Sequence, residues 1–300
     1  MKAWSEWWIH GVIPLALLHA ALVLTLQARP GRIAPLLWKA GPILLVILAS
    51  VLLAAAFLSS LRNRHTWNRR RAAALAALFL LVMATGTYRT YPSSYDDKPS
   101  AVDFRLPLDG PVTVAWGGAG EKVNHHVINP EERWGYDLLV TVDGVTHRGN
   151  TTALTDYYAY DRPVHAPAAG RIVDVHDGDA DAPPGRADRR RRGGNRVVLE
   201  VAPGQYLFIL HLKAGTIRVA PGQDVREGQS VGHVGNSGNS SEPHVHVHLQ
   251  DSPELGVGEG IPLYFSNYAV LVSGATIRRG IPQGGVRGGR YVGETIARAE

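Results

Sequence analysis

One short segment near the C-terminal end of the chain reads Pro243-His244-Val245-His246-Val247-His248-Leu249-Gln250. Histidines and apolar residues alternate in it with a period of two residues, which is the period of a β-strand. In a strand, the three histidines would lie on one face and Val245, Val247 and Leu249 on the other. Such a row of imidazoles is typical of a metal site, and the alternative is a solvent-facing strand that happens to carry histidine.

More candidate ligands precede this segment. The 300-residue chain has no cysteine, so any metal must be held by His, Asp or Glu. An apolar run from Phe208 to Leu212 carries a single histidine, His211, for which the alternative is a hydrogen-bonded core residue. Asn124-His125-His126 and Asp137 offer a histidine and a carboxylate before the central strands. Two histidines and one aspartate, with the fourth position open to water, form a catalytic zinc site.

The C-terminal two thirds of the chain predict a mostly antiparallel β domain, because short apolar stretches alternate there with glycine and proline. Two polar inserts interrupt the pattern, Asp143 to Asp161 and Asp177 to Gly194. The second insert has four consecutive arginines, which predict a solvated loop, with a specific anionic partner as the alternative. The expected strands are Val112 to Trp116, Tyr136 to Val142, Arg171 to His176, Arg196 to Val201, Tyr206 to Leu212, Ser230 to Val234 and His244 to Gln250.

The first third of the chain predicts three transmembrane helices. Ile9 to Leu26, Gly41 to Leu61 and Ala72 to Tyr88 are apolar runs of about membrane-crossing length without Asp, Glu, Lys or Arg. The loop from Arg62 to Arg71 has five arginines and no acid, which places it in the cytoplasm and the chain after Tyr88 outside.

The basic charge belongs to this same region. Through Lys98 the chain has 11 Lys and Arg against 3 Asp and Glu, whereas the remainder has 20 against 23. This distribution favours a membrane topology signal over a nucleic-acid interface. We therefore expect a membrane region at residues 1–90, a linker at 91–110, the β domain at 111–270 and a tail at 271–300, with no nucleic-acid partner.

An ordered series of motifs resembles the lysostaphin-type or LytM-type zinc endopeptidases of bacterial cell walls. The resemblance extends from Leu106 to Tyr268. It rests on the early histidine and aspartate, Pro163-Val164-His165-Ala166-Pro167-Ala168-Ala169-Gly170-Arg171-Ile172-Val173, His211-Leu212, Val219-Ala220-Pro221-Gly222-Gln223-Asp224-Val225-Arg226-Glu227-Gly228-Gln229, and the Gly-Asn-Ser loop before Pro243.

The resemblance implies a function and a set of site residues. By matching positions, His126, Asp137 and His246 become zinc ligands, and His211 and His244 become catalytic histidines. The implied activity is hydrolysis of peptide bonds in peptidoglycan by a LytM-type β domain. This substrate fits the location predicted from the spans and the arginine-rich loop, which is a domain anchored to the bacterial inner membrane on its extracytoplasmic side. A protein activator is left open. The alternatives are a catalytically silent wall-binding or regulatory module, and a zinc-responsive membrane sensor.

One departure from the family pattern concerns the first ligand. Ten residues separate His126 from Asp137, where most members have only a few. His125 is therefore an alternative to His126, which we prefer because it ends an Asn-x-His form seen in a related branch. His248 is expected either to support a ligand or to be a plain exposed residue.

Overall fold

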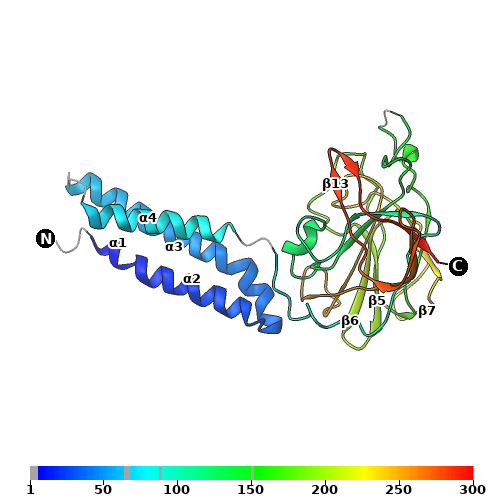
Figure 1. Ribbon diagram of the computed structural model, residues 1–300, viewed down its shortest axis with the longest axis horizontal. Coiled ribbons are helices and arrows are strands. Elements are labelled where there is room, and N and C mark those ends of the chain that lie inside the picture. Colours follow the sequence, from blue (N-terminus) through cyan, green and yellow to red (C-terminus); the bar gives the residue numbers. More distant parts are fainter. Residues whose placement is uncertain (1–5, 64–67, 88–89, 150–151, 300) are drawn as a thin grey trace. The chain divides into compact units, whose positions relative to one another are not determined.

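The computed structural model describes residues 6–63, 68–87, 90–149 and 152–299. The chain divides into two compact units, Met1–Ser94 and Tyr95–Glu300 (Figure 1). Residues 64–67 of the basic loop and Tyr88, at the end of the third expected span, lie outside the described residues.

The first unit is helical. Its helices are α1 (Trp7–His10), α2 (Val12–Gln27), α3 (Ala34–Asn63) and α4 (Arg69–Thr85), with a short 3-10 helix, η2 (Gly31–Ile33), between α2 and α3. Leu15, Ala49 and Leu78 are buried where α2, α3 and α4 pack together, whereas Ile13, Ile43 and other large apolar side chains are exposed. Exposed apolar surface of this extent is typical of a protein interface or a membrane interface.

Two helical segments among the described residues are long and apolar enough to cross a membrane, Trp7–Gln27 and Ala34–Leu61. The third expected span falls in α4, which has only 17 residues and begins with Arg69-Arg70-Arg71. The prediction of three such helices is therefore corrected to two candidates. The physical reason is that arginines occupy the first turn of α4 and shorten its apolar length.

The second unit is built on an antiparallel sheet of 11 strands. In spatial order the path is β12-β11-β15-β1-β2-β9-β6-β5-β4-β7, with β10 paired to β9, and β3-β8 and β13-β14 form two small separate sheets. The strands are β1 (Val112–Trp116), β2 (Tyr136–Leu139), β3 (Pro163–His165), β4 (Gly170–His176), β5 (Asn195–Ala202), β6 (Gln205–Leu212), β7 (Asp224–Val225), β8 (Ser230–His233), β9 (Val245–Gln250), β10 (Gly260–Ile261), β11 (Phe265–Val270), β12 (Ala275–Gly280), β13 (Val286–Arg287), β14 (Arg290–Tyr291) and β15 (Thr295–Arg298). The predicted mostly antiparallel β architecture is confirmed.

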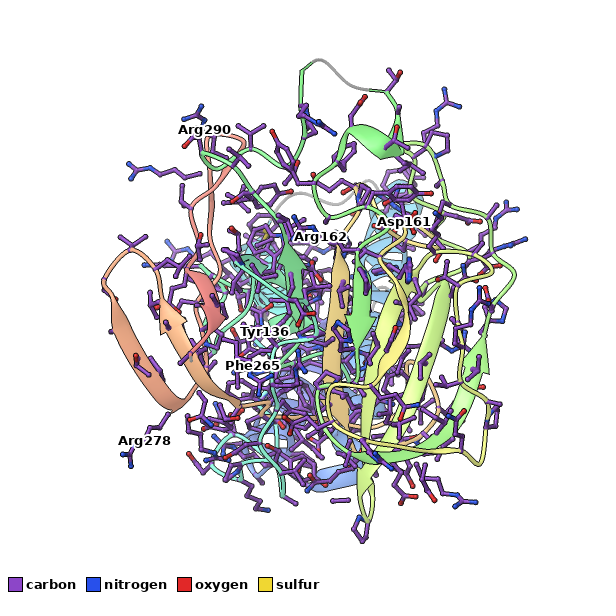
Figure 2. All side chains as sticks on the ribbon, turned by 90° about the vertical axis from the view of Figure 1, so that its right-hand side faces the viewer. Tyr136, Asp161, Arg162, Phe265, Arg278 and Arg290 are labelled. Carbon is purple, nitrogen blue, oxygen red and sulfur yellow. The ribbon has the colours of Figure 1, made fainter. Side chains whose placement is uncertain are left out.

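One apolar core supports the sheet. Val245, Val247 and Leu249 of β9 enter it with no exposed surface, as the alternation of the segment predicts. Figure 2 shows Tyr136 and Phe265 directed toward each other in the interior, with ring centroids 5.1 Å apart, while Arg278 and Arg290 extend outward. Because one face of β9 is committed to this core, its histidines must all lie on the other face.

The C-terminal residues take part in the same sheet. The strand β15 pairs with both β1 and β11, and its Ile296 is fully buried in the core. The hairpin β13-β14 follows β12 and brings residues 290 and 291 beside the loop at Gly144, whose carbonyl accepts a hydrogen bond from the Tyr291 N–H at 3.4 Å. Residues 271–300, which the sequence assigns to a tail, thus supply the strands from β12 to β15.

Candidate metal centre

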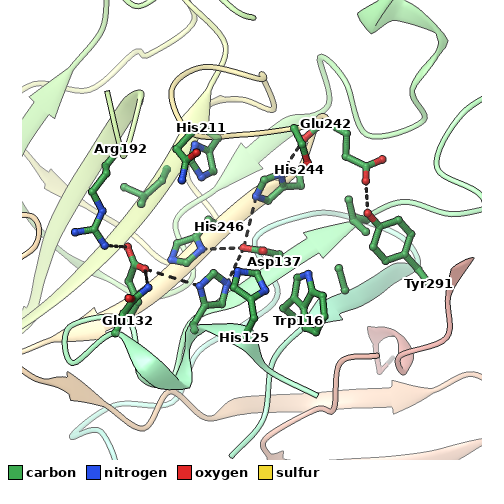
Figure 3. Close-up of a pocket in the computed structure, with 17 residues that line it drawn as sticks. Trp116, His125, Glu132, Asp137, Arg192, His211, Glu242, His244, His246 and Tyr291 are labelled. Atoms are coloured by element: carbon green, nitrogen blue, oxygen red, sulfur yellow. Dashed lines mark hydrogen bonds and ion pairs between the residues drawn. The ribbon is translucent and has the colours of Figure 1, made fainter. Parts of the chain in front are cut away.

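The central feature of the site is the pairing of β2, β9 and β6. Asp137 on β2 lies opposite His246 on β9, and Leu210 on β6 lies opposite His246 on its other side. This register brings Asp137 Oδ1 to 2.8 Å from His246 Nδ1 (Figure 3). Two residues separated by 109 positions in the chain therefore meet through strand pairing.

A short turn places the third expected ligand. His126 belongs to the 3-10 helix η3 (His125–Ile128), which begins after Asn124. The buried Asn124 side chain accepts from the His126 N–H at 3.0 Å and donates to the carbonyls of Gly118 and Gly135. The turn is thereby tied to the loops on both sides of it, and His126 Nε2 is held 3.2 Å from Asp137 Oδ1.

The neighbouring histidine has a different environment. His125 is exposed, whereas His126 is buried. The His125 ring contacts Trp116 edge-on at 4.7 Å and lies 4.0 Å from the His126 ring, measured between centroids. Even so, one ligand atom each of His125, His126 and Asp137 lie within 4.8 Å of one another.

The residues around Asp137 fit a divalent metal. His126 Nε2 is buried and makes no hydrogen bond within the part of the chain that the structure describes, although Asp137 Oδ1 is near. His246 Nδ1 and Asp137 Oδ1 complete a set of two nitrogen donors and one oxygen donor. Imidazole and carboxylate are ordinary zinc ligands, and three of them leave a position open.

Two further histidines face the same pocket. His211, the last residue but one of β6, has a positive φ of 65°, and its Nδ1 donates to the Ser237 carbonyl at 2.9 Å. His244 Nδ1 donates to the Glu242 carbonyl at 2.8 Å, and its Nε2 lies 3.5 Å from Asp137 Oδ1. Their ring centroids are 4.8 Å apart. In both rings Nδ1 is bound to the main chain, so Nε2 is the atom available for chemistry.

Local electrostatics separate these two histidines. Burial lowers the pKa of His211 to about 3, which keeps the ring neutral at ordinary pH. Burial alone would also lower the pKa of His244, but the Asp137 carboxylate raises it above its usual value. One imidazole is therefore suited to accept a proton and the other to carry one.

His248 is fully buried, so the expectation of a plain exposed residue is wrong. Its ring stacks on Phe208 of β6, with centroids 4.7 Å apart and planes inclined by 8°. It also lies behind His246, because its Nδ1 is 2.9 Å from His246 Nε2. The alternation of the segment predicts on which face of β9 His248 lies. It does not predict that Phe208 of β6 buries the ring.

The pocket has a volume of about 320 Å³ and contains all five predicted site residues, His126, Asp137, His211, His244 and His246. Sequence reasoning missed several other lining residues, which are Trp116, Glu132, Arg192, Glu242 and Tyr291 (Figure 3). Glu132 lies within the unusually long spacing between His126 and Asp137, which is the one signal that could have indicated it.

Two of these residues come from the segments that the sequence left unexplained. Arg192, the last of four consecutive arginines, pairs with Glu131 at 3.1 Å and Glu132 at 3.4 Å, so this part of the run is not simply solvated. Tyr291, from β14, donates a hydrogen bond to the Glu242 carboxylate, which also accepts from Thr146 Oγ1 at 2.6 Å. The pocket wall thus includes an insert and the C-terminal hairpin.

A family model matches part of this domain. Residues 147–255 match the model for Peptidase family M23. The matched range contains His211, His244 and His246, whereas His126 and Asp137 precede it. The match confirms the resemblance predicted from the motifs and supports a peptidase.

Similar solved structures were also found, whereas no curated protein matches the chain. A mutant catalytic domain of the prophage-encoded M23 protein EnpA from Enterococcus faecalis is 20% identical with a TM-score of 0.35, over 53% of this chain and 94% of that one. A zinc-containing peptidase from Vibrio cholerae is 19% identical with a TM-score of 0.33, over 53% and 39%. The catalytic domain of lysostaphin from Staphylococcus simulans is 18% identical with a TM-score of 0.30, over 50% and 86%.

Proposed function

We propose that the β domain, whose residues 147–255 match peptidase family M23, is a zinc metalloendopeptidase with His126, Asp137 and His246 as its metal ligands. The observation that carries the proposal is the convergence of His126 Nε2 and His246 Nδ1 on Asp137 Oδ1, at 3.2 Å and 2.8 Å. His211 and His244 line the same pocket, so ligands and proton-transfer groups share one space.

His126 is preferred over His125 as the first ligand. The buried His126 Nε2 lacks a hydrogen-bond partner among the described residues, and a metal would bind its lone pair. His125 is exposed beside Trp116, where it can contact a bound substrate. Zinc content separates the two assignments. Substitution of His126 should lower it, whereas substitution of His125 should leave it unchanged.

The reaction is hydrolysis of a peptide bond. A zinc ion held by these ligands would polarise the scissile carbonyl and make water more acidic. His211, neutral because burial lowers its pKa to about 3, offers Nε2 to accept the proton of the attacking water. His244, whose pKa is raised by Asp137, donates from Nε2 to the developing oxyanion or the leaving amine.

The proposed substrate is the peptide part of peptidoglycan, on the extracytoplasmic side of the bacterial inner membrane. The support for both the substrate and the location is the family resemblance, because peptidoglycan lies outside the cytoplasm.

Reporter fusions test this topology. Alkaline phosphatase, which is active only outside the cytoplasm, should be active when fused after Tyr95. An inactive fusion, with the protein produced, would place the β domain in the cytoplasm and remove peptidoglycan as its substrate.

Release of soluble muropeptides tests the activity. The full chain, purified in detergent, is incubated with peptidoglycan in a zinc-loaded form, in a chelated form and as the His246→Ala variant. We expect release only from the zinc-loaded wild-type protein. A zinc-loaded, folded wild type that binds peptidoglycan without releasing product would instead identify a silent wall-binding module.

A further inference from the structure

Three buried side chains form a line behind the pocket. His246, His248 and Gln250 alternate along β9, so they lie on the same face of the strand. His246 Nε2 is 2.9 Å from His248 Nδ1, and His248 Nε2 is 3.2 Å from Gln250 Oε1. His248 and Gln250 have no exposed surface. Neither belongs to the pocket lining, so both are outside the catalytic residues described above.

The direction of the Gln250 amide is set by its surroundings. Its Nε2 lies 2.7, 2.8 and 3.0 Å from the carbonyl oxygens of Ser252, Glu254 and Val257, which share its two N–H donors. If the amide were flipped, Oε1 would face three carbonyl oxygens and could accept from none of them. Gln250 Oε1 is therefore held toward His248, where it can only accept a hydrogen bond.

This acceptor determines which nitrogen of His248 carries the proton. Nε2 must donate to Gln250 Oε1, so a neutral His248 has a bare Nδ1. The flat stack on Phe208 fixes the plane of the ring and keeps both nitrogens in line with their partners. The bare Nδ1 then accepts a hydrogen bond from His246 Nε2.

The consequence falls on the proposed ligand. When Nε2 of His246 retains its proton to serve His248, Nδ1 is the nitrogen whose lone pair can be given to a metal. Nδ1 is also the atom that lies 2.8 Å from Asp137 Oδ1. Partners behind a ligating histidine select its tautomer and its ring orientation in this way.

We propose that His248 and Gln250 are positioning residues that keep a proton on Nε2 of His246 and so present its Nδ1 to the metal. The inference rests on the proposed zinc site but concerns residues that touch neither metal nor substrate. His248 thus supports the ligand, and the loop that follows β9 determines which of its ring nitrogens carries the proton.

Two variants at one position separate hydrogen bonding from packing. H248N keeps an acceptor, because its Oδ1 takes the place of Nδ1, whereas H248F keeps an aromatic ring on Phe208 but has no acceptor. Zinc dissociation constants are measured by competition with a chelator on the full chain in detergent. We expect H248F to bind zinc about 10- to 100-fold more weakly than the wild type, and H248N within about 3-fold of it. Equal affinity in H248F and the wild type would overturn the proposal.

A second measurement uses the wild-type chain alone. Nitrogen-15 chemical shifts of histidine-labelled protein, with the His248 signals assigned by H248N, report which ring nitrogen is protonated. We expect His248 to be neutral with the proton on Nε2, both with and without zinc. A proton on Nδ1 would overturn the proposal, even if H248F does not fold. A wild type that binds no zinc would overturn the proposed function, while the proton position on His248 would still decide the hydrogen-bond chain.

Discussion

The two sides of the His246 ring have opposite hydrogen-bonding arrangements. On the pocket side, His211 and His244 each use Nδ1 for a main-chain carbonyl, and both residues line the pocket. On the other side, both nitrogens of His248 are bonded to side chains of its own strand. His211 and His248 are both buried, and burial lowers the pKa of each to about 3.

This comparison teaches that burial and pKa alone do not identify a catalytic histidine. What differs is whether a nitrogen remains without a protein partner and faces the pocket. Among the described residues, His211 Nε2 has no hydrogen-bond partner, whereas both nitrogens of His248 have one. Substitutions on the pocket side should therefore lower turnover, and those on the other side should lower zinc affinity. The four expectations below run from the largest effect to the smallest.

Removal of His246, the ligand between the two sides, should abolish both zinc binding and peptide hydrolysis. His246→Ala eliminates Nδ1 and leaves Asp137 and His126 too few to hold zinc. Muropeptide release should fall to background, and the purified full chain should contain no zinc by elemental analysis. Chelation of the wild-type protein should give the same loss, and added zinc should restore activity in the wild type but not in the variant.

Substitution on the pocket side should affect turnover without affecting the metal. His211→Ala removes the proposed proton acceptor, which is expected to lower kcat about 10²- to 10⁴-fold. Zinc content should stay at the wild-type value because His211 is not a ligand. Steady-state kinetics with a soluble muropeptide, combined with zinc analysis, measure both quantities. Loss of zinc in this variant would contradict the assigned role.

Substitution at the far end of the hydrogen-bond chain should have a weaker effect on the metal. Gln250→Met keeps the volume but removes the acceptor for His248, so His248 can change its tautomer. We expect zinc affinity to fall by no more than about 10-fold, at the lower end of the range for groups behind a ligand. Chelator competition measures the change, and a loss as large as that in H248F would indicate that the loop after β9 has been disrupted instead.

The smallest effect is expected for Tyr291, in the pocket wall. Tyr291→Phe removes the hydrogen bond to Glu242 but leaves the ring in the pocket wall. KM should rise by about 5-fold or less, because Thr146 still holds the Glu242 carboxylate after the loss of its hydrogen bond from Tyr291. Zinc content and kcat should stay unchanged. A fall in kcat comparable to that of His211→Ala would place Tyr291 in the chemistry.

Much of the β domain follows from local patterns. The alternation in β9 determines which residues enter the core, because a strand with one buried face leaves no freedom in the direction of its side chains. The same reasoning predicts β1, β2, β4, β5, β6 and β8 within a few residues. In contrast, residues 271–300 have weak patterns, so pairing of β15 with β1 and β11 became visible only in the folded sheet.

The sequence determines the residue types that can hold a metal, since the chain has no cysteine and its histidines and Asp137 stand in recognisable motifs. The fold decides which atoms meet. Asp137 and His246 come together through the register of β2 and β9, and His248 is covered because β6 places Phe208 against it. The physical reason is that side-chain direction follows from local periodicity, whereas strand register, burial and proton position depend on partners far away in the chain.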